Sequence, residues 1–204
     1  PGAGMDGKNL HELIESEKAT LLLGVPTVWL GLLNYLDSIN AKMHSVNHVV
    51  VGGSAAPLAM IRAFDEKHDA FLIHAWGMTE MSPLGTVNGP TAELMVLPKE
   101  ERYKRQLKQG RPIYGVDLKI IDDDGKELPR DGKAYGRLLV RGPWITNGYY
   151  KSDDRSAFID GWFDTGDVAT LDALNTMQIV DRRKDVIKSG GEWISSIDLE
   201  NIAV

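Results

Sequence analysis

Short apolar runs alternate with stretches of helical spacing in the first half of the chain. The runs cover residues 20–25, 48–51 and 71–74, and helical patterns lie between them, for example over residues 58–67. Short apolar strands that alternate with helices are typical of a parallel sheet with helices on its faces. We therefore expect these runs to form buried parallel strands.

A different pattern begins near residue 110. Residues 116–121 alternate in polarity, residues 136–141 form another strand-like run, and turns rich in Gly, Pro and Asp separate such runs. Closely spaced strands without crossover helices predict a small antiparallel sheet or barrel. Just before this region, residues 99–108 are densely charged, and we expect them to form a helix with a solvated surface.

Together these patterns predict an α/β fold in which a partial parallel sheet with flanking helices precedes a small antiparallel, barrel-like subdomain and a hinge. We place the α/β part at residues 1–108 and the barrel-like subdomain at residues 109–181. The hinge and the start of a further domain then occupy residues 182–204.

The composition narrows the classes of function. The 204 residues include no Cys, which excludes disulfides and thiolate chemistry and fits a reducing cytoplasm. The net charge of -6 disfavours a nucleic-acid partner, because such partners favour basic domains. No apolar run is long enough to cross a bilayer, so we expect at most a peripheral contact with membranes.

Two loops after the apolar runs carry candidate binding residues. Gly52, Gly53 and Ser54 follow the second run, and small residues there let the backbone approach an anionic ligand at a helix N-terminus. A tight structural turn is an equally good interpretation of this loop. The third run leads into residues 74–80, His-Ala-Trp-Gly-Met-Thr-Glu. At the carboxyl end of a parallel strand, these side chains would face a ligand crevice.

The residue types in this second loop suit a nucleotide. The Trp76 ring can cover a flat base, the Thr79 hydroxyl can donate to a phosphate oxygen, and the Glu80 carboxylate can hold Mg²⁺. The alternative is a strand, a turn and a helix start in which Thr79 or Glu80 serves only as a cap.

Two later stretches add further candidates. Gly166 precedes Asp167 between two strand-like runs, so we expect Asp167 to project from a turn, where its carboxylate can accept both hydroxyls of a ribose. The alternative is an Asx-type turn. The charged run from Asp181 ends in Gly190, Gly191 and Trp193, which predicts a hinge rather than a mere solvated face.

These blocks stand in one order along the chain: residues 52–54, 76–80, 165–167 and 181–191. In this order and at these spacings they resemble the adenylate-forming superfamily of acyl-CoA synthetases, luciferases and nonribosomal peptide adenylation domains. Residues 188–196, Lys-Ser-Gly-Gly-Glu-Trp-Ile-Ser-Ser, are most similar to the fatty-acyl-CoA ligase branch, which includes medium-chain and methylthiopropionate-type ligases.

The resemblance implies a role for each matching residue. Trp76 would stack on adenine, Thr79 would contact the α-phosphate, and Glu80 would hold Mg²⁺. Asp167 and Arg182 would bind the ribose. The other implied nucleotide-contacting positions are Gly52, Gly53, Ser54, Ala75 and Gly77.

The resemblance also implies positions for the acid, the hinge and coenzyme A. Residues implied at the acyl pocket are Val25, Trp29, His74 and Met78. Lys184 matches the hinge about which a C-terminal domain rotates. Lys188 and Gly190 fall in the segment that swings in for thioester formation.

The implied reaction has two steps. A fatty or other short- or medium-chain carboxylic acid attacks the α-phosphate of ATP, which gives acyl-AMP and pyrophosphate, and the coenzyme A thiolate then displaces AMP. An acyl-AMP ligase or another adenylating enzyme with a different acceptor is one alternative. A nucleotide-binding module without catalysis is another.

The family's phosphate-binding loop would lie upstream of Pro1, and its adenylating lysine would lie beyond Val204. We therefore expect this chain to be a fragment in which Trp76 borders an open groove. We predict that the 204-residue chain by itself has no ligase activity. The check is a pyrophosphate-release assay with ATP and a fatty acid, in which release above background would contradict the prediction.

Overall fold

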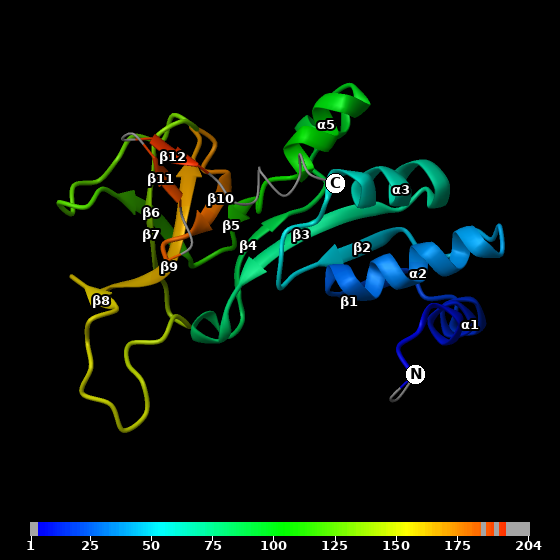
Figure 1. Ribbon diagram of the computed structural model, residues 1–204, viewed down its shortest axis with the longest axis horizontal. Helices are drawn as coiled ribbons and strands as arrows, with labels where there is room; N and C mark the ends of the chain where they lie inside the picture. Colours follow the sequence, from blue (N-terminus) through cyan, green and yellow to red (C-terminus); the bar gives the residue numbers. More distant parts are fainter. Residues whose placement is uncertain (1–3, 185–186, 190–191, 195–204) are drawn as a thin grey trace. The chain divides into compact units, whose positions relative to one another are not determined.

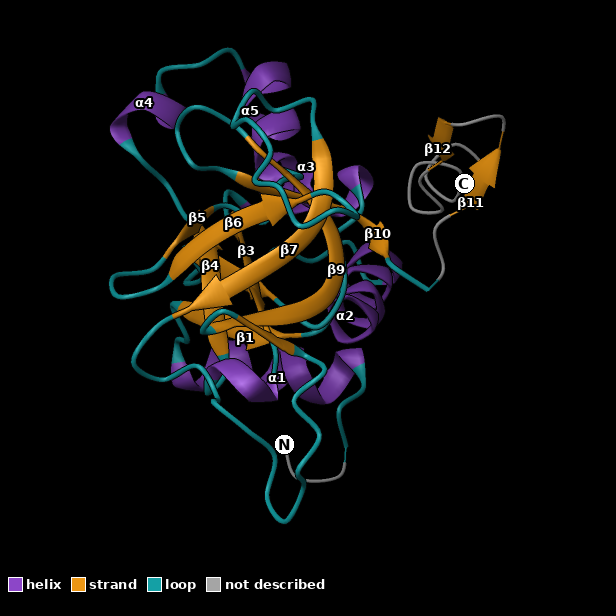
Figure 2. Ribbon diagram, turned by 90° about the vertical axis from the view of Figure 1, so that its left-hand side faces the viewer, coloured by secondary structure: helices purple, strands orange, loops and turns teal. Residues whose placement is uncertain are grey.

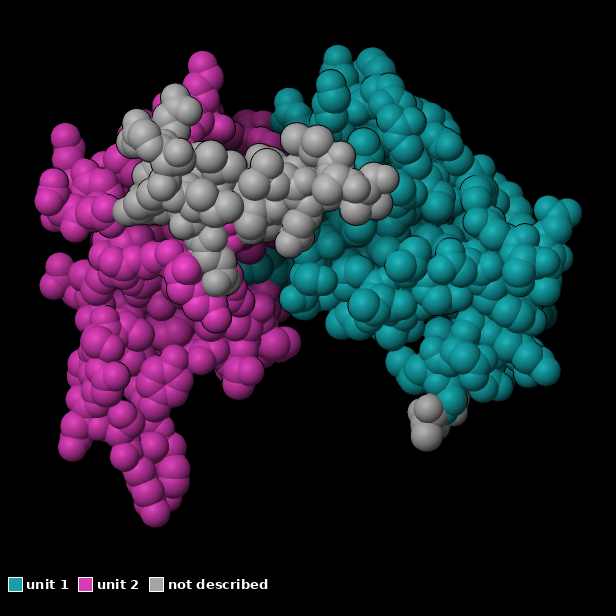
Figure 3. Space-filling model, in the orientation of Figure 1, with its two compact units in different colours: residues 1–76, 88–107 teal, residues 77–87, 108–204 magenta. Residues whose placement is uncertain are grey.

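The computed structural model describes residues 4–184, 187–189 and 192–194. The chain divides into two compact units (Figure 3). The first unit comprises Pro1–Trp76 and Asn88–Leu107, and the second comprises Gly77–Val87 and Lys108–Val204. The sequence-based domain boundaries stay a prediction, but residues 77–87 group here with the later part of the chain.

The first unit alternates helices and strands (Figure 1). Its elements are α1 (Gly7–Glu17), β1 (Leu21–Gly24), α2 (Pro26–Ser38), β2 (His48–Val51), α3 (Leu58–His68), β3 (Phe71–Gly77), α4 (Ala92–Met95) and α5 (Lys99–Gln106). Strands β1, β2 and β3 are parallel neighbours, and Gly24, Val51 and His74 are register partners. The carboxyl ends of these strands therefore meet at one edge of the sheet.

Burial alternates along these strands. The register partners Leu22, Val49 and Leu72 are at most 9% exposed and pack in one core cluster with residues of α1, α2, α3 and α5. On the opposite face of β1, Leu21 and Leu23 are 50% and 68% exposed. The expectation of a fully buried strand is therefore wrong for β1, because the helices of this unit pack against one face of the sheet.

Helix α5 also differs from the expected solvated helix. Tyr103 is 1% exposed and its hydroxyl donates to Asp65 of α3 at 2.6 Å, while Arg102 donates to the same carboxylate at 2.8 Å. Lys99 lies 3.0 Å from that carboxylate as well. Part of the charge on α5 therefore forms a docking face against α3.

The second unit is mostly antiparallel. Its elements are η1 (Thr79–Met81), β4 (Leu84–Asn88), β5 (Arg111–Pro112), β6 (Asp117–Ile121), β7 (Tyr135–Arg141), β8 (Phe158–Ile159), β9 (Trp162–Leu171), β10 (Met177–Arg182), β11 (Ile187–Ser189) and β12 (Glu192–Ile194). A sheet of order β10-β9-β7-β6 curves along β7 and β9 (Figure 2). Strands β4 and β5 pair antiparallel, as do β11 and β12.

The predicted fold class is confirmed. A parallel sheet with flanking helices lies in the first unit, and a curved antiparallel sheet lies in the second. Among the described residues, no helix combines the length and the apolar character that a bilayer crossing requires.

The core of the first unit generates a stability prediction. Phe64 of α3 is fully buried in the core cluster, so Phe64→Ala is expected to lower the free energy of unfolding by about 3–5 kcal/mol. Leu30→Ala on α2 is the control, because Leu30 is 53% exposed and its loss is expected to cost at most about 0.5 kcal/mol. Urea denaturation followed by circular dichroism measures both, and equal losses would contradict the assignment of Phe64 to the core.

Candidate functional site

Several predicted site residues meet at the carboxyl edge of the parallel sheet. Val25 follows β1 as the N-cap of α2, and the Gly52 N–H donates to the Gly24 carbonyl at 3.1 Å. A Cβ on Gly52 would lie 3.3 Å from the Ala75 carbonyl oxygen, and one on Gly53 would lie 3.3 Å from the Val25 Cγ1. Gly53 has a φ of +83°, a backbone conformation that favours glycine. The first unit thus brings these residues together.

His74 lies at the same edge and is buried. It is 2% exposed, and the backbone of Ser54, Gln106 and Leu107 contacts its ring. Burial lowers the pKa of His74 to about 4, so the imidazole is neutral near pH 7. Among the described residues, its Nδ1 atom has no hydrogen-bond partner. The loop of residues 52–54, the Gly52 loop, is therefore bordered by a neutral imidazole whose buried Nδ1 atom lacks a hydrogen-bond partner among the described residues.

The two tryptophans of the predicted site are both largely buried. Trp29 is 4% exposed, its indole N–H donates to the Val50 carbonyl at 3.1 Å, and its ring covers Gly24. Trp76 is 8% exposed at the end of β3. The expectation that Trp76 borders an open groove is therefore wrong. A ring so enclosed offers little surface to a base, and its stacking role stays a prediction.

The segment after Trp76 belongs to the second unit. Gly77 is required there by close packing, because a Cβ on it would lie 1.9 Å from the Pro83 carbonyl oxygen. Met78 is the N-cap of η1 and makes no side-chain capping bond. The alternative in which Thr79 or Glu80 caps a helix is therefore wrong. Thr79 is exposed and Glu80 is partly exposed.

Sequence reasoning missed the contact that holds Glu80. The Tyr149 hydroxyl donates to Glu80 Oε1 at 3.0 Å, and the Thr146 N–H donates to the Glu80 carbonyl at 2.8 Å. Burial first, and then the hydrogen bond to Glu80, raises the pKa of Tyr149. The partners are 69 positions apart, so no local pattern in the sequence indicated this pairing.

Asp167 lies inside a strand and not in the predicted turn between two strands. Strand β9 runs through it, and the pairing of β9 with β7 shifts register between Arg137 and Leu139. Gly166 has a φ of +74°, and a glycine with positive φ inside a strand is typical of a β-bulge. This irregularity, the bulge formed by residues 164–167, replaces the expected turn.

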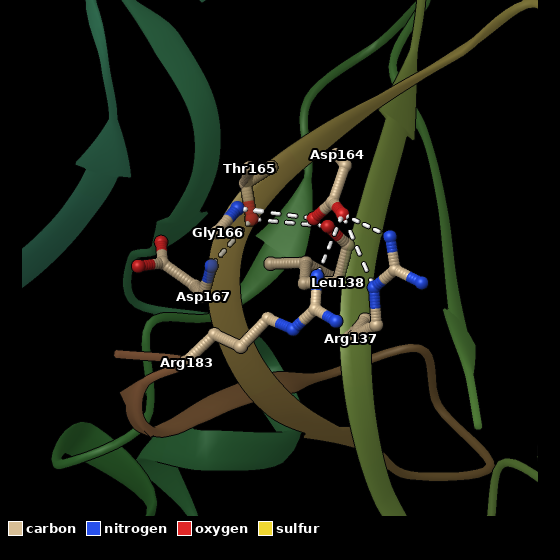
Figure 4. A network of polar contacts seen from close by, with 7 residues as sticks. All are labelled: Arg137, Leu138, Asp164, Thr165, Gly166, Asp167 and Arg183. Carbon is tan, nitrogen blue, oxygen red and sulfur yellow. Dashed lines mark hydrogen bonds and ion pairs between the residues drawn. The ribbon is translucent and has the colours of Figure 1, made fainter. Parts of the chain in front are cut away.

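The bulge presents a buried carboxylate. The Asp167 side chain is 3% exposed, and its Oδ1 lies 2.9 Å from Arg182 Nε on the neighbouring strand β10. A cavity of about 460 Å³ adjoins it and is lined by Gly166, Arg182, Arg183 and Lys184. The two residues predicted to share a ribose are therefore in contact, beside a cavity with a cationic lining. Figure 4 shows the Asp167 carboxylate directed away from the neighbouring Asp164.

Two predicted positions lie near the C-terminal end of the described residues or outside them. Lys188 lies in β11, opposite Trp193 of β12. Gly190 lies outside the described residues. Met78 is partly buried next to η1, and Lys184 is exposed just after β10.

Comparison with known proteins identifies the family. Residues 1–150 match a protein family described as AMP-binding enzyme. The chain belongs to this family. The resemblance inferred from the sequence motifs is therefore confirmed.

Relatives within the AMP-binding family are similar over the whole chain. A 3-methylmercaptopropionyl-CoA ligase of Ruegeria lacuscaerulensis is 52% identical over 204 residues, which are 100% of this chain and 38% of the relative. A medium-chain-fatty-acid–CoA ligase of Ectopseudomonas oleovorans is 51% identical over 100% of this chain and 37% of its own length. The chain thus spans well under half the length of these relatives.

Solved structures support the same assignment. The anthranilate CoA ligase AuaEII in complex with anthranoyl-AMP aligns with a TM-score of 0.82 at 27% identity, over 98% of this chain and 37% of that one. An o-succinylbenzoate coenzyme A synthetase from Bacillus subtilis, in complex with ATP and magnesium ion, aligns with a TM-score of 0.79 at 25% identity, over 98% of this chain and 39% of that one.

The burial of His74 generates a prediction on pH dependence. The pKa of this ring falls from its usual 6.5 to about 4 on folding, so the unfolded chain binds more protons between these values. The contribution of the neutral His74 ring to the free energy of unfolding is therefore present above pH 6.5 and is lost as the pH falls toward 4. We expect the loss of stability between about pH 7.5 and about pH 5 to be about 2 kcal/mol larger in the wild type than in His74→Gln.

Urea denaturation of the wild type and of His74→Gln at both pH values measures this difference. His44→Gln is the control, because it removes an exposed imidazole of the same unit and leaves the buried His74 ring in place. Identical pH dependence in the wild type and in His74→Gln would contradict the burial of a neutral ring.

Proposed function

We propose that this chain is part of an AMP-forming acyl-CoA ligase, which activates a carboxylic acid as acyl-AMP and transfers the acyl group to coenzyme A. The observation that carries the proposal is the contact between the buried Asp167 carboxylate and Arg182 at 2.9 Å, beside a cavity lined by cationic residues. Relatives named as CoA ligases, at 51% and 52% identity over the whole chain, support it.

The ribose of ATP is the ligand group that suits Asp167. A carboxylate is an acceptor only and can take both hydroxyls of a ribose, and here its charge is balanced by Arg182. The neighbouring cavity has Arg182, Arg183 and Lys184 in its lining, so it favours negatively charged groups. Thr79 of the same unit is proposed to contact the α-phosphate, and the adenine-stacking role of the enclosed Trp76 ring stays a prediction.

The proposed site offers few protein ligands to Mg²⁺. Glu80 offers a carboxylate whose Oε1 accepts from Tyr149, and the described residues contain no group of three or more acidic, His or Cys side chains that could hold a metal ion by themselves. Mg²⁺ commonly takes one or two carboxylates and completes its shell with phosphates and water. Glu80 would therefore hold the ion together with the phosphates of ATP, and the ion would neutralise charge on them.

The carboxyl edge of the first unit suits the acid. Val25 is 43% exposed there, the Gly52 loop lets the backbone approach a ligand, and the buried His74 ring is neutral. A neutral, mostly apolar wall favours an apolar acyl chain over a charged one. On the first unit we assign the acyl side to Val25 and His74, with Trp29 supporting the wall from the core. Met78 of the second unit keeps its implied role toward the acyl group.

The later residues serve the second step. Lys184 lies two positions after the end of β10 at Arg182 and is the proposed hinge. Lys188 and Gly190 belong to the segment proposed to reach the thioester site when the hinge turns. Catalysis in this scheme depends on positioning and charge stabilisation, so no nucleophilic side chain is required.

The test uses the complete enzyme that contains this chain. We expect acid-dependent pyrophosphate release from ATP and formation of an acyl-CoA thioester. Asp167→Asn should lower kcat/KM for ATP by about 10- to 100-fold, because an amide cannot replace the charged acceptor and Arg182 loses its partner. Steady-state kinetics with varied ATP measures the change.

Asp153→Asn is the matched control, because Asp153 is an exposed carboxylate of the same unit. Its kinetics should equal those of the wild type. Acyl-AMP that forms but never passes to coenzyme A would overturn the assignment as a CoA ligase and indicate an adenylating enzyme with another acceptor. No acid-dependent pyrophosphate release would overturn the adenylation chemistry itself.

A further inference from the structure

Asp164 is a second, partly buried carboxylate in the bulge, and the proposed chemistry does not use it. Its side chain is 9% exposed, and it receives bonds from residues that are distant in the sequence. Arg137 of β7 donates from Nε to Asp164 Oδ2 at 3.1 Å and also from Nη2 to the same oxygen. The Arg183 Nη1 atom lies 3.9 Å from that oxygen. A buried carboxylate with two cations beside it is costly to displace.

The other oxygen of Asp164 holds the backbone of the bulge. Its Oδ1 accepts the N–H of Gly166 at 3.1 Å (Figure 4). The Gly166 carbonyl in turn accepts the N–H of Arg183 at 2.9 Å. Thr165 adds a further link, because its hydroxyl donates to the Leu138 carbonyl at 3.0 Å and accepts the N–H of Asp167 at 3.1 Å. The backbone that leads into Asp167 is therefore held by Asp164, by Thr165 and by the N–H of Arg183.

These bonds matter because the bulge has little stiffness of its own. Gly166 has no side chain, and a Cβ at this position would meet no atom within 4 Å, so packing does not restrain it. Its φ of +74° is one of several conformations open to glycine. The placement of the next residue, Asp167, thus depends on the hydrogen bonds at Gly166 and Thr165. A displacement of about 1 Å at a binding group can cost about 100-fold in rate.

We propose that Asp164 is a positioning residue for nucleotide recognition: clamped by Arg137, it holds the Gly166 peptide so that the Asp167 carboxylate meets the ribose hydroxyls. This inference rests on the proposed function of Asp167. Asp164 is not a ligand itself, since its carboxylate is directed toward Arg137 while that of Asp167 is directed away (Figure 4).

The same sheet contains a second aspartate–arginine pair that does not hold the bulge. Asp117 of β6 lies 2.9 Å from Arg141 of β7, and the two side chains are 63% and 54% exposed. This pair joins neighbouring strands as the Asp164–Arg137 pair does, but it lies on the surface and outside the bulge. It separates the effect of an aspartate–arginine pair on the sheet from an effect on Asp167.

The experiment compares ATP with 2'-deoxy-ATP in the complete enzyme. A carboxylate that binds the 2'-hydroxyl is expected to favour ATP by about 10- to 100-fold in kcat/KM in the wild type. Asp164→Asn should reduce this preference to about threefold or less, because a displaced Asp167 no longer reaches the hydroxyl. Asp117→Asn should keep the wild-type preference.

A second variant guards against loss of folding. Asp164→Asn leaves Arg137 with a weakened partner inside the sheet, whereas the double variant Arg137→Met with Asp164→Leu removes both charges together. We expect the double variant to keep a cooperative thermal transition and to lose the preference for ATP. Thermal melts by circular dichroism and the ATP to 2'-deoxy-ATP ratio are read side by side.

The outcomes separate the two proposals. A wild-type enzyme that makes acyl-AMP without preferring ATP over 2'-deoxy-ATP would refute the role of Asp167, and the inference would fall with it. A wild-type preference that persists in both Asp164 variants, whatever their melting temperatures, would refute the positioning role alone. Failure of both variants to fold would assign the pair to stability and would also refute the role.

Discussion

The common register of the parallel strands is the constraint on which the first unit depends. Because Gly24, Val51 and His74 are partners across β1, β2 and β3, β1 and β2 end beside His74 and their loops meet at one edge of the sheet. Backbone hydrogen bonds set this arrangement, and the loop residues then follow it. The close approach of Gly52 to the Ala75 carbonyl is a direct consequence.

Buried carboxylates impose a comparable constraint on the second unit. A charge removed from water requires a partner, and each acidic side chain of the bulge has an arginine from another strand: Arg182 beside Asp167, and Arg137 beside Asp164. The two pairs divide the work. The Asp167–Arg182 pair lies beside the cavity. In the Asp164–Arg137 pair, Asp164 accepts the Gly166 N–H and so holds the backbone that carries Asp167.

Contacts between residues distant in the sequence stabilise the arrangement of elements within both units. Tyr149 and Thr146 fix Glu80 from a loop far along the chain, and Asp65 collects Lys99, Arg102 and Tyr103 to dock α5 on α3. The second case explains why a helix of high charge density is partly buried: its charges have a specific partner. The density of charge in a helix follows from its sequence, but whether its charged side chains face water depends on where their partners lie in the fold.

The sequence by itself determined the fold class, the order of the motifs and the family, because apolar periodicity and local motifs depend on neighbouring residues. It also predicted that Asp167 and Arg182 act together. The tertiary structure decided what depends on packing between distant segments: which face of β1 is covered, how far Trp76 is enclosed, and that Asp167 sits in a bulge of one strand. The partners Arg137 and Tyr149 belong to the same class. Their roles arise from strand pairing and loop closure, which bring together residues whose spacing along the chain carries no periodic signal.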